Sequence, residues 1–281
     1  MVLLAKRMPI EEVIKTTGFR TREAGLLEQV VRLYSHFETG RIDKDSMIIG
    51  GFAARLYIST KYKGKLSHDE KIDCEPTDVD VIFNGMPSEF RSLLVEERWV
   101  ERREKRTPLL GGGERVVPAL MSEYSSYHLR PEVRTQPGMQ ILDNACFFDR
   151  KVGRVIVREE DLQRARLLDV YIGNGEQRLD GTIRVAEPGF LLATVINPIA
   201  STPKRSWRAV LVLASLSPHE REEAIERYVE TVKISRFTLE ELEGSLKTLQ
   251  QEGNRKNFFE VVGKFISEVQ QRMAPMVALP G

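Results

Sequence analysis

Apolar residues recur at helical spacing near the start of the chain and then gather into short runs. Between Thr21 and Glu38 they mark one face of a helix, at Leu26, Leu27, Val30, Val31, Leu33, Tyr34 and Phe37. Gly40 follows as a natural helix stop. The next apolar run, Met47 to Ile49, leads directly into a pair of glycines, and the residues after that pair favour a second helix.

The pattern then changes to strands and turns. The lysine-rich stretch from Ser59 to Pro76 has no clear period and predicts a loop or insertion. Thr77 to Phe83 alternates polar and β-branched residues, which is typical of a strand. Pro87 opens a predicted helix that runs to about Lys105. Prolines and glycines divide residues 107–150 into short pieces, which indicates strands joined by turns.

Helical signals dominate the last third of the chain. Leu167 to Ile172 is the last long strand expected, with Thr182 to Val185 as its partner. Pro188 then occupies a first helical position, and Ser217 and Thr238 each begin a capping box. We therefore predict an α/β (α+β) fold, a mixed sheet flanked by helices over residues 1–186. A C-terminal helical bundle is predicted over residues 187–281.

Composition adds bounds on the class of protein. The chain has 281 residues, of which 41% are hydrophobic and 30% charged, and a net charge of +1. This composition predicts a folded protein. Its small net charge gives no overall electrostatic attraction to nucleic acid or to an anionic membrane. We expect no membrane segment, because the longest apolar run is too short to span a bilayer. Two distant cysteines and the lack of a signal peptide favour a cytoplasmic location.

Two aspartates on the strand over residues 77–83 are the first candidates for chemistry. Side chains two positions apart on a strand point to the same face, so Asp78 and Asp80 are expected to project side by side. Two neighbouring carboxylates repel each other unless a cation lies between them, and Mg²⁺ prefers such oxygen ligands. Gly50 and Gly51 allow close approach of a phosphate to the start of the following helix.

A third acid would complete a site for two metal ions, which lowers the pKa of an attacking hydroxyl. Asp169 lies in the apolar strand Leu167 to Ile172 and is the first choice. Asp143, which also follows two apolar residues, is its rival. Asp78, Asp80 and Asp169 are thus predicted to be both metal ligands and catalytic residues, with Mg²⁺ or Mn²⁺ as the metal.

These motifs resemble a known superfamily. The segments MIIGGFAARLY and PTDVDVIF, with Asp169 between apolar residues, resemble the nucleotidyltransferases related to DNA polymerase beta. They look most like abortive-infection-type nucleotidyltransferase toxins and their uncharacterised prokaryotic relatives. The resemblance extends over roughly residues 20–215. It implies a polymerase beta-like fold, in which Gly50 and Gly51 bind the nucleotide.

The resemblance also implies an activity. Such a protein transfers a nucleotidyl group from a nucleoside triphosphate to an acceptor hydroxyl and requires Mg²⁺. The sequence leaves the acceptor open between a tRNA end, a protein side chain and a small molecule. Lys204 and Arg205 are expected to meet the nucleotide phosphates, and the helical C-terminal region to shape the acceptor side or contact a protein partner, as in toxin–antitoxin pairs.

The chain departs from this family at three points. The link between Gly51 and Asp78 is long, which indicates an insertion near residues 60–75. The stretch LLATVINPIA lacks the family's lysine, and Arg205 stands where an acid of a Lys-Asp pair belongs. Phe52 replaces a serine or threonine. These departures motivate an alternative: a catalytically silent protein that binds nucleotide or a protein partner.

Other motifs are weaker. The triple glycine at 111–113 lacks the Lys-Ser or Lys-Thr of a P-loop, so a turn is favoured. No Gly-x-Ser-x-Gly occurs, which argues against a serine hydrolase of that type. The four histidines are scattered and more typical of structural or exposed positions. One of them, His68, lies with Asp69 in the suspected insertion, where a solvated loop is expected.

Overall fold

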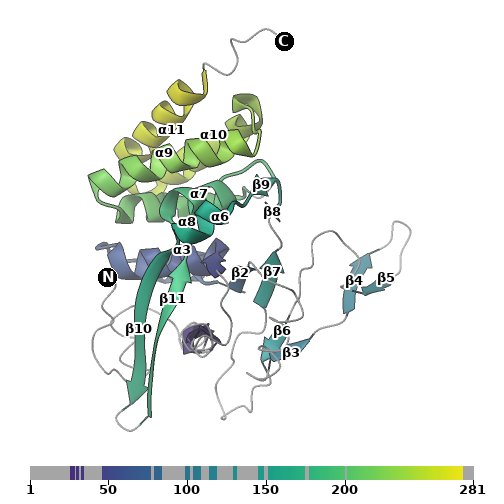
Figure 1. Cartoon of the computed structure of the whole chain (residues 1–281). Helices are drawn as coiled ribbons and strands as arrows, with labels where there is room; N and C mark the ends of the chain where they lie inside the picture. The colour runs from purple at the N-terminus through teal and green to yellow at the C-terminus, as the bar shows by residue number, and fades with distance from the viewer. Residues whose placement is uncertain are drawn as a thin grey trace. The chain divides into compact units, whose positions relative to one another are not determined.

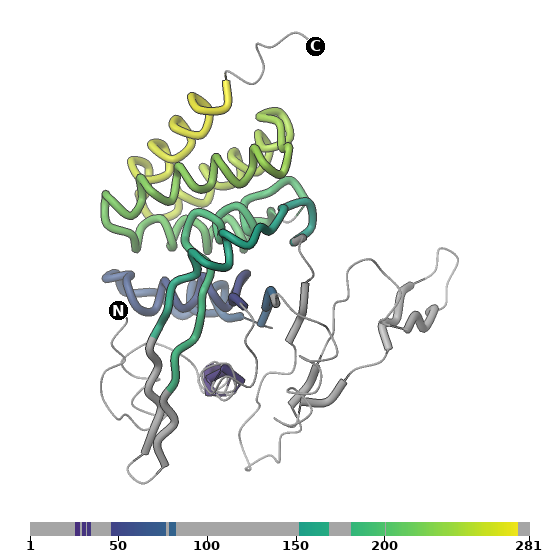
Figure 2. The backbone as a smooth tube through the Cα atoms, in the orientation of Figure 1, coloured from purple at the N-terminus to yellow at the C-terminus, as the bar shows by residue number. Residues whose placement is uncertain are grey.

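The chain folds into two compact units, each assembled from separate segments. Figure 1 labels their helices and strands. The computed structural model describes residues 26–28, 30–31, 33–34, 46–76, 79–83, 99–101, 104–108, 114–118, 129–131, 145–148, 151–174, 177–199 and 201–274. Figure 2 traces them in colour wherever their placement is certain. Unit 1 comprises Met1–Ile48, Thr77–Arg150 and Arg166–Val185, and unit 2 comprises Ile49–Pro76, Lys151–Ala165 and Ala186–Gly281. Unit 2 therefore combines the C-terminal segment from Ala186 with two segments that come earlier in the chain.

Unit 1 is built on a mixed sheet, as expected for the α/β class. In its described part, seven strands follow the order β10-β11-β1-β2-β7-β6-β3. Their bounds are β1 Ser46–Ile49, β2 Val79–Phe83, β3 Trp99–Glu101, β6 Leu129–Pro131, β7 Ala145–Phe148, β10 Arg166–Asn174 and β11 Gln177–Val185. The pairs β1–β11 and β2–β7 are parallel, whereas β10–β11, β6–β7 and β3–β6 are antiparallel. A separate pair joins β4 (Glu104–Pro108) to β5 (Glu114–Pro118).

Apolar strand residues fill the core of unit 1. All four residues of β1 are buried, and so are Val79 and Val81 of β2. The described positions between residues 26 and 34 are helical, and their apolar side chains are buried, as the periodicity predicted. The predicted helix up to Lys105 is wrong over its last part, because Trp99–Glu101 pairs with β6 and Glu104 begins β4. Pairing with a neighbouring strand outweighs the helical tendency of the charged sequence there. Residues 84–98 lie outside the described ranges.

Unit 2 is helical, and α8 lies at its centre. Its elements are α3 Gly50–Lys61, α4 His68–Cys74, β8 Lys151–Val152, β9 Val155–Ile156, α6 Glu159–Gln163, α7 Pro188–Val195, α8 Pro203–Ser215, α9 Pro218–Ile234, α10 Leu239–Gly253, η1 Asn254–Lys256 and α11 Phe259–Met273. Helix α8 packs against α3, α4, α7, α10 and α11, and Trp207 on it is fully buried. Helix α11 packs on α9 and α10 (Figure 1). No helix within the described ranges has the length and apolar character needed to cross a bilayer.

Helix starts in unit 2 follow the capping signals of the sequence. Ser217 and Thr238 form the predicted capping boxes, and Pro188 is the first residue of α7. The predicted loop over residues 59–76 is wrong in part, because it contains the end of α3 and the whole of α4. Ser67 caps α4 and forms a reciprocal box with Glu70, whose side chain accepts from the Ser67 amide at 2.7 Å.

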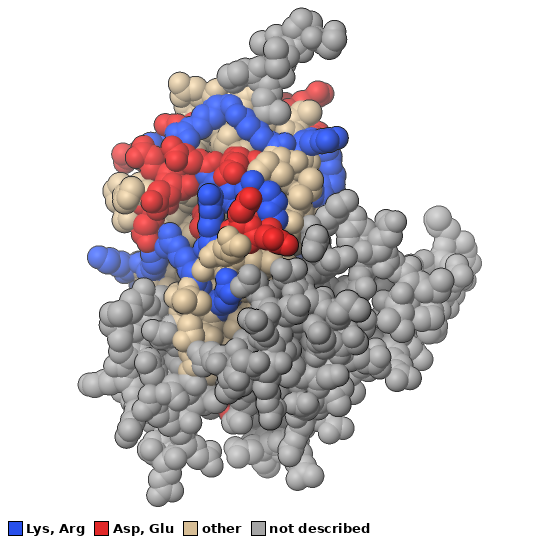
Figure 3. Space-filling view, viewed as in Figure 1, with Lys and Arg blue, Asp and Glu red and all other residues tan. Residues whose placement is uncertain are grey.

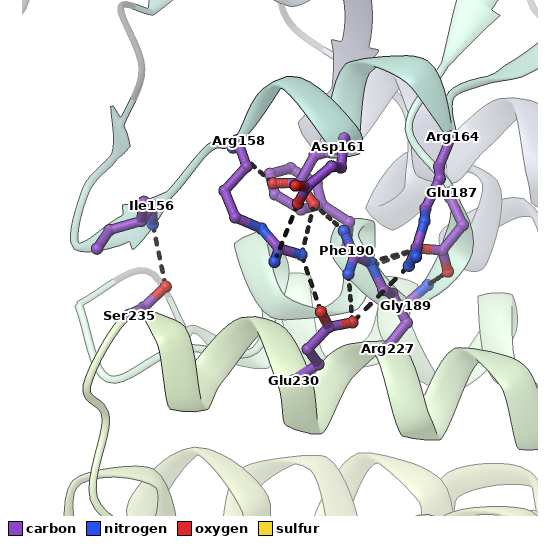
Figure 4. A network of polar contacts seen from close by, with 11 residues as sticks. Ile156, Arg158, Asp161, Arg164, Glu187, Gly189, Phe190, Arg227, Glu230 and Ser235 are labelled. Atoms are coloured by element: carbon purple, nitrogen blue, oxygen red, sulfur yellow. Dashed lines mark hydrogen bonds and ion pairs between the residues drawn. The ribbon is translucent and has the colours of Figure 1, made fainter.

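Buried charged residues join the segment 151–165 to helices α7 and α9 (Figure 4). Asp161 forms an ion pair with Arg227, and their side chains are only 2% and 6% exposed. Arg227 also pairs with Glu187, at 3.5 Å, and with Glu230. Glu230 accepts a second hydrogen bond from Arg158, at 3.0 Å. Acids and bases alternate through this network, so each buried charge has a partner.

The network depends on a close approach of α7 to α9. A Cβ atom on Gly189 of α7 would overlap the backbone oxygen of Ala224 and lie 2.5 Å from the Cβ of Arg227. Glu187 caps α7 by accepting from the Gly189 amide at 2.6 Å, next to the guanidinium of Arg227. The absence of a side chain at residue 189 therefore brings the capping acid and the buried arginine together.

Replacement of Arg227 should destabilise the fold strongly. Arg227→Met leaves Asp161 buried without its main partner, and breaking such a pair costs about 3–5 kcal/mol. Lys264→Met is the matched control, since Lys264 and Glu222 pair at 3.5 Å with both side chains at least half exposed; it should cost less than about 1 kcal/mol. Urea unfolding of the full chain measures both, and equal losses would contradict a stabilising role for the network.

Glu230 should make the stability of unit 2 sensitive to acid. Burial tends to raise the pKa of Glu230, but hydrogen bonds from Arg227 and Arg158 outweigh it and hold that pKa below the ordinary 4.5. A carboxylate with a lowered folded-state pKa contributes stability above its unfolded pKa and loses it as the pH falls further. The free energy of unfolding should therefore decline below pH 4.5 less steeply in Glu230→Gln than in the wild type. Glu243→Gln, in an exposed position of α10, should retain the wild-type slope.

Candidate functional site

The predicted glycine pair forms the turn between β1 and α3. Gly50 has a φ of +69°, a left-handed conformation that costs other residues about 1–2 kcal/mol. The N-cap residue, Ile49, makes no side-chain hydrogen bond to the helix, and every residue from Phe52 to Ile58 is buried. Helix α3 is therefore fixed in the core of unit 2, with the positive end of its dipole at the glycine turn.

Arg208 of α8 lies against this turn. A Cβ atom on Gly51 would overlap its guanidinium, at 3.1 Å from Cζ and nearer still to Nη1. Nε of Arg208 donates to the backbone oxygen of Asp73 at 3.2 Å, and Nη2 donates to that of Glu75 at 2.7 Å. The guanidinium is thus held from two sides: its Nε and Nη2 atoms cap the C-terminal end of α4, and its Nη1 atom lies over Gly51.

Lys204 belongs to the same group, whereas Arg205 does not share its face. Lys204 is one turn before Arg208 on α8, so their side chains are neighbours. Partial desolvation of the ammonium group, followed by the charge of Arg208, lowers the pKa of Lys204; Asp73 and Glu75 oppose the shift. Arg205 is exposed at the next position, where its amide donates to the N-cap hydroxyl of Thr202 at 3.4 Å.

The suspected insertion is bound firmly to the helices of unit 2. Glu70 pairs with Lys256 of η1, and Asp73 pairs with Arg255 at 3.4 Å. Tyr62 meets Phe258 edge-on, with 6.3 Å between the ring centroids. Burial tends to raise the pKa of Glu70, but its hydrogen bonds with Lys256 and Ser67 outweigh this and lower it. Residues 62–76 therefore form an ordered support, which we call the α4 arm.

Asp80 has the placement that the strand pattern predicted. It lies on β2 between the buried Val79 and Val81, and its own side chain is half-buried. Its partner on the parallel strand β7 is Cys146. A partly exposed carboxylate on a rigid central strand fits the oxygen ligands that Mg²⁺ takes. Asp78 lies outside the described residues.

The order of the sheet separates Asp169 from Asp80. Asp169 is on β10, opposite Thr182 of β11, and its side chain lies outside the described part. Because β11 and β1 lie between β10 and β2, three strand spacings separate the two acids, about 14 Å. A metal ion holds its carboxylate oxygens within about 2.6 Å. The rival acid Asp143 precedes β7, the neighbour of β2, by two residues; it too lies outside the described ranges.

Among the described side chains, no three His, Cys, Asp or Glu residues gather as metal ligands. His68 and Asp69, in the predicted insertion, are exposed on α4. On the face in view in Figure 3, acidic and basic side chains are interspersed over the described helices. Near Lys204, likewise, the charge of Arg208 is opposed by those of Asp73 and Glu75.

Sequence reasoning did not identify Arg208. The sequence feature that could have pointed to Arg208 is its spacing of four residues from Lys204, in a helix whose start is marked by Thr202-Pro203. That spacing predicts a shared face but not that Gly51 and the α4 arm would meet there. Only the packing of α3 and α4 on α8 brings them together.

The chain matches neither the models of known protein families nor any curated protein. The function is therefore argued from the glycine turn, the basic residues beside it and the acid on β2.

Proposed function

We propose that the protein is a Mg²⁺-dependent nucleotidyltransferase of the polymerase beta-like type. The observation that carries the proposal is the glycine turn: a left-handed Gly50 starts a buried helix, and Gly51 lies beside a guanidinium. An amide end of a helix with an adjacent cation is suited to bind phosphate. Asp80 on β2, the sheet neighbour of β1, supplies a carboxylate suited to a divalent cation.

In this proposal, each group has one task. Asp78 and Asp80 hold the metal, and Gly50 and Gly51 bind the triphosphate. When bound, Mg²⁺ neutralises phosphate charge and lowers the pKa of the attacking hydroxyl. The hydroxyl oxygen of the acceptor forms a bond to the α-phosphorus, the bond to the bridging oxygen breaks, and pyrophosphate leaves. The hydroxyl proton passes to the third acid.

The sheet order supports Asp143 as this third acid over Asp169. Asp143 precedes β7, the strand next to β2, by two positions in the sequence, whereas Asp169 is on β10, three strands away from Asp80. Both assignments remain within the same proposed reaction. They differ only in which carboxylate receives the proton.

Helix α7 favours a second candidate, a nucleotide-binding protein without turnover. The family's lysine is expected in this region, but every residue of α7 from Pro188 to Val195 is buried. A lysine there would meet the core instead of a phosphate. Calorimetry with each nucleoside triphosphate and Mg²⁺ separates the candidates: binding with label transfer indicates the enzyme, and binding alone indicates the silent protein.

Asp80→Asn should abolish label transfer. Removal of one carboxylate charge weakens the metal site while leaving the size of the side chain unchanged. The assay incubates the protein with α-labelled nucleoside triphosphates, Mg²⁺ and bulk tRNA, and also detects label on the protein itself. Glu243→Gln, on exposed α10, should transfer at the wild-type rate. Wild-type activity in Asp80→Asn, with an unchanged melting temperature, would rule out the assignment of Asp80.

The third acid can be assigned by a pair of matched variants. Asp143→Asn should lower the rate of transfer at least 100-fold, the usual scale for loss of a general base. Asp169→Asn should retain most of the activity, because its strand is separated from β2 by β11 and β1. The reverse result would assign the role to Asp169 and contradict the argument from the sheet order.

A further inference from the structure

Helix α4 depends on polar contacts more than the other helices of unit 2 do. It has only seven residues, too few for a helix that is stable by itself. Glu70 and Cys74 are its only buried residues, and its one aliphatic side chain, Ile72, is 43% exposed. Little apolar surface is therefore buried by α4, and its order depends on the charged groups around it.

Two of these charged groups lie on η1, the corner between α10 and α11. Lys256 pairs with Glu70 and also donates to the backbone oxygen of Lys65 at 3.4 Å. Arg255 pairs with Asp73 at 3.4 Å. The first pair is shielded from water on its acidic side, since the side chain of Glu70 is only 8% exposed. We call these two ion pairs the η1 latch.

The cations of the η1 latch are themselves held firmly. Asn257, which follows η1, has a φ of +60° and turns the chain toward α11. Arg255 also pairs with Glu252 of α10 at 2.7 Å, and its guanidinium lies over the ring of Trp207, 4.8 Å from the ring centroid. Because Trp207 is fully buried in α8, the latch connects the α4 arm to the centre of unit 2.

The α4 arm leads directly to the strand of the predicted metal ligands. Only Thr77 and Asp78 separate its last residue, Pro76, from β2, which carries Asp80. A link of two residues has little slack, because the reach of the backbone is fixed by its bond lengths. A displacement of Pro76 is therefore expected to shift Asp78.

We propose that the η1 latch positions the metal-binding segment: Glu70 and Lys256 hold the α4 arm, and the arm fixes the course of the chain into Asp78 and Asp80. This inference rests on the proposed function and adds positioning residues to it. Neither Glu70 nor Lys256 is a metal ligand in this proposal. Groups that orient metal ligands from outside the coordination sphere change metal affinity by about 10- to 100-fold.

Hydrogen exchange on the full chain tests whether the latch acts on β2. Lys256→Gln removes the charge that pairs with Glu70, so the amides of α4 and β2 should exchange about 10-fold faster, as local opening becomes easier. Helix α9 should keep its wild-type rates. Lys256→Arg restores the charge and should return both elements to wild-type exchange. Lys264→Gln, which breaks an exposed pair on α11, is the matched control and should leave α4 and β2 unchanged.

Two results of the exchange experiment would overturn the proposal. Faster exchange in α4 alone would show that the arm moves without affecting the strand of Asp80. An equal increase in α9 would show that the pair of Glu70 with Lys256 supports unit 2 as a whole and has no particular effect on β2.

The Mg²⁺ dependence of label transfer provides the second readout. Lys256→Gln should raise the Mg²⁺ concentration at half-maximal rate about 10-fold, as expected for displaced metal ligands. Lys256→Arg and Lys264→Gln should keep the wild-type requirement. A general loss of stability lowers the amount of active protein and hence the maximal rate, but it leaves the Mg²⁺ requirement of the remaining protein unchanged.

The same measurement separates failure of the latch from failure of the proposed function. Wild-type Mg²⁺ dependence in Lys256→Gln overturns the role of the latch and leaves the proposed function intact. Wild-type protein that transfers no label at any Mg²⁺ concentration contradicts the proposed function itself, and the role of the latch falls with it.

Discussion

The burial of α8 is the constraint on which the rest of unit 2 depends. Helices α3, α7, α10 and α11 pack around it, and its centre, including Trp207, has no access to water. A helix enclosed in this way can carry charge only near its ends. Its charged residues, Lys204, Arg205 and Arg208, are accordingly confined to the first two turns, and the glycine turn meets the helix there.

The α4 arm shows how such an arrangement is completed. A lysine-rich stretch without a period becomes a helix because Ser67 and Glu70 cap it and because its C-terminal carbonyls accept from Arg208. Arg208 in turn has a defined orientation because those carbonyls face it. The arm and the arginine stabilise each other, and Gly51 leaves the space in which they meet.

The sheet of unit 1 illustrates the difference between order in the chain and order in space. The three acids of the sequence argument come one after another along the chain, but β10 is separated from β2 by β11 and β1. β2 pairs in parallel with β7, where Cys146 lies opposite Asp80. Hydrogen-bond pairing between distant strands decides which carboxylates are neighbours.

The sequence by itself determined the local features: the strand around Asp80 with its buried valines, the glycine turn, the capping boxes at Ser217 and Thr238, and the mixed α/β class. These depend on neighbouring residues and on the periods of helices and strands. The tertiary structure alone decided the interleaved composition of the two units, the strand at Trp99, the fold of the α4 arm and the position of Arg208 against Gly51. Each depends on contacts between residues far apart in the chain, which no local pattern encodes.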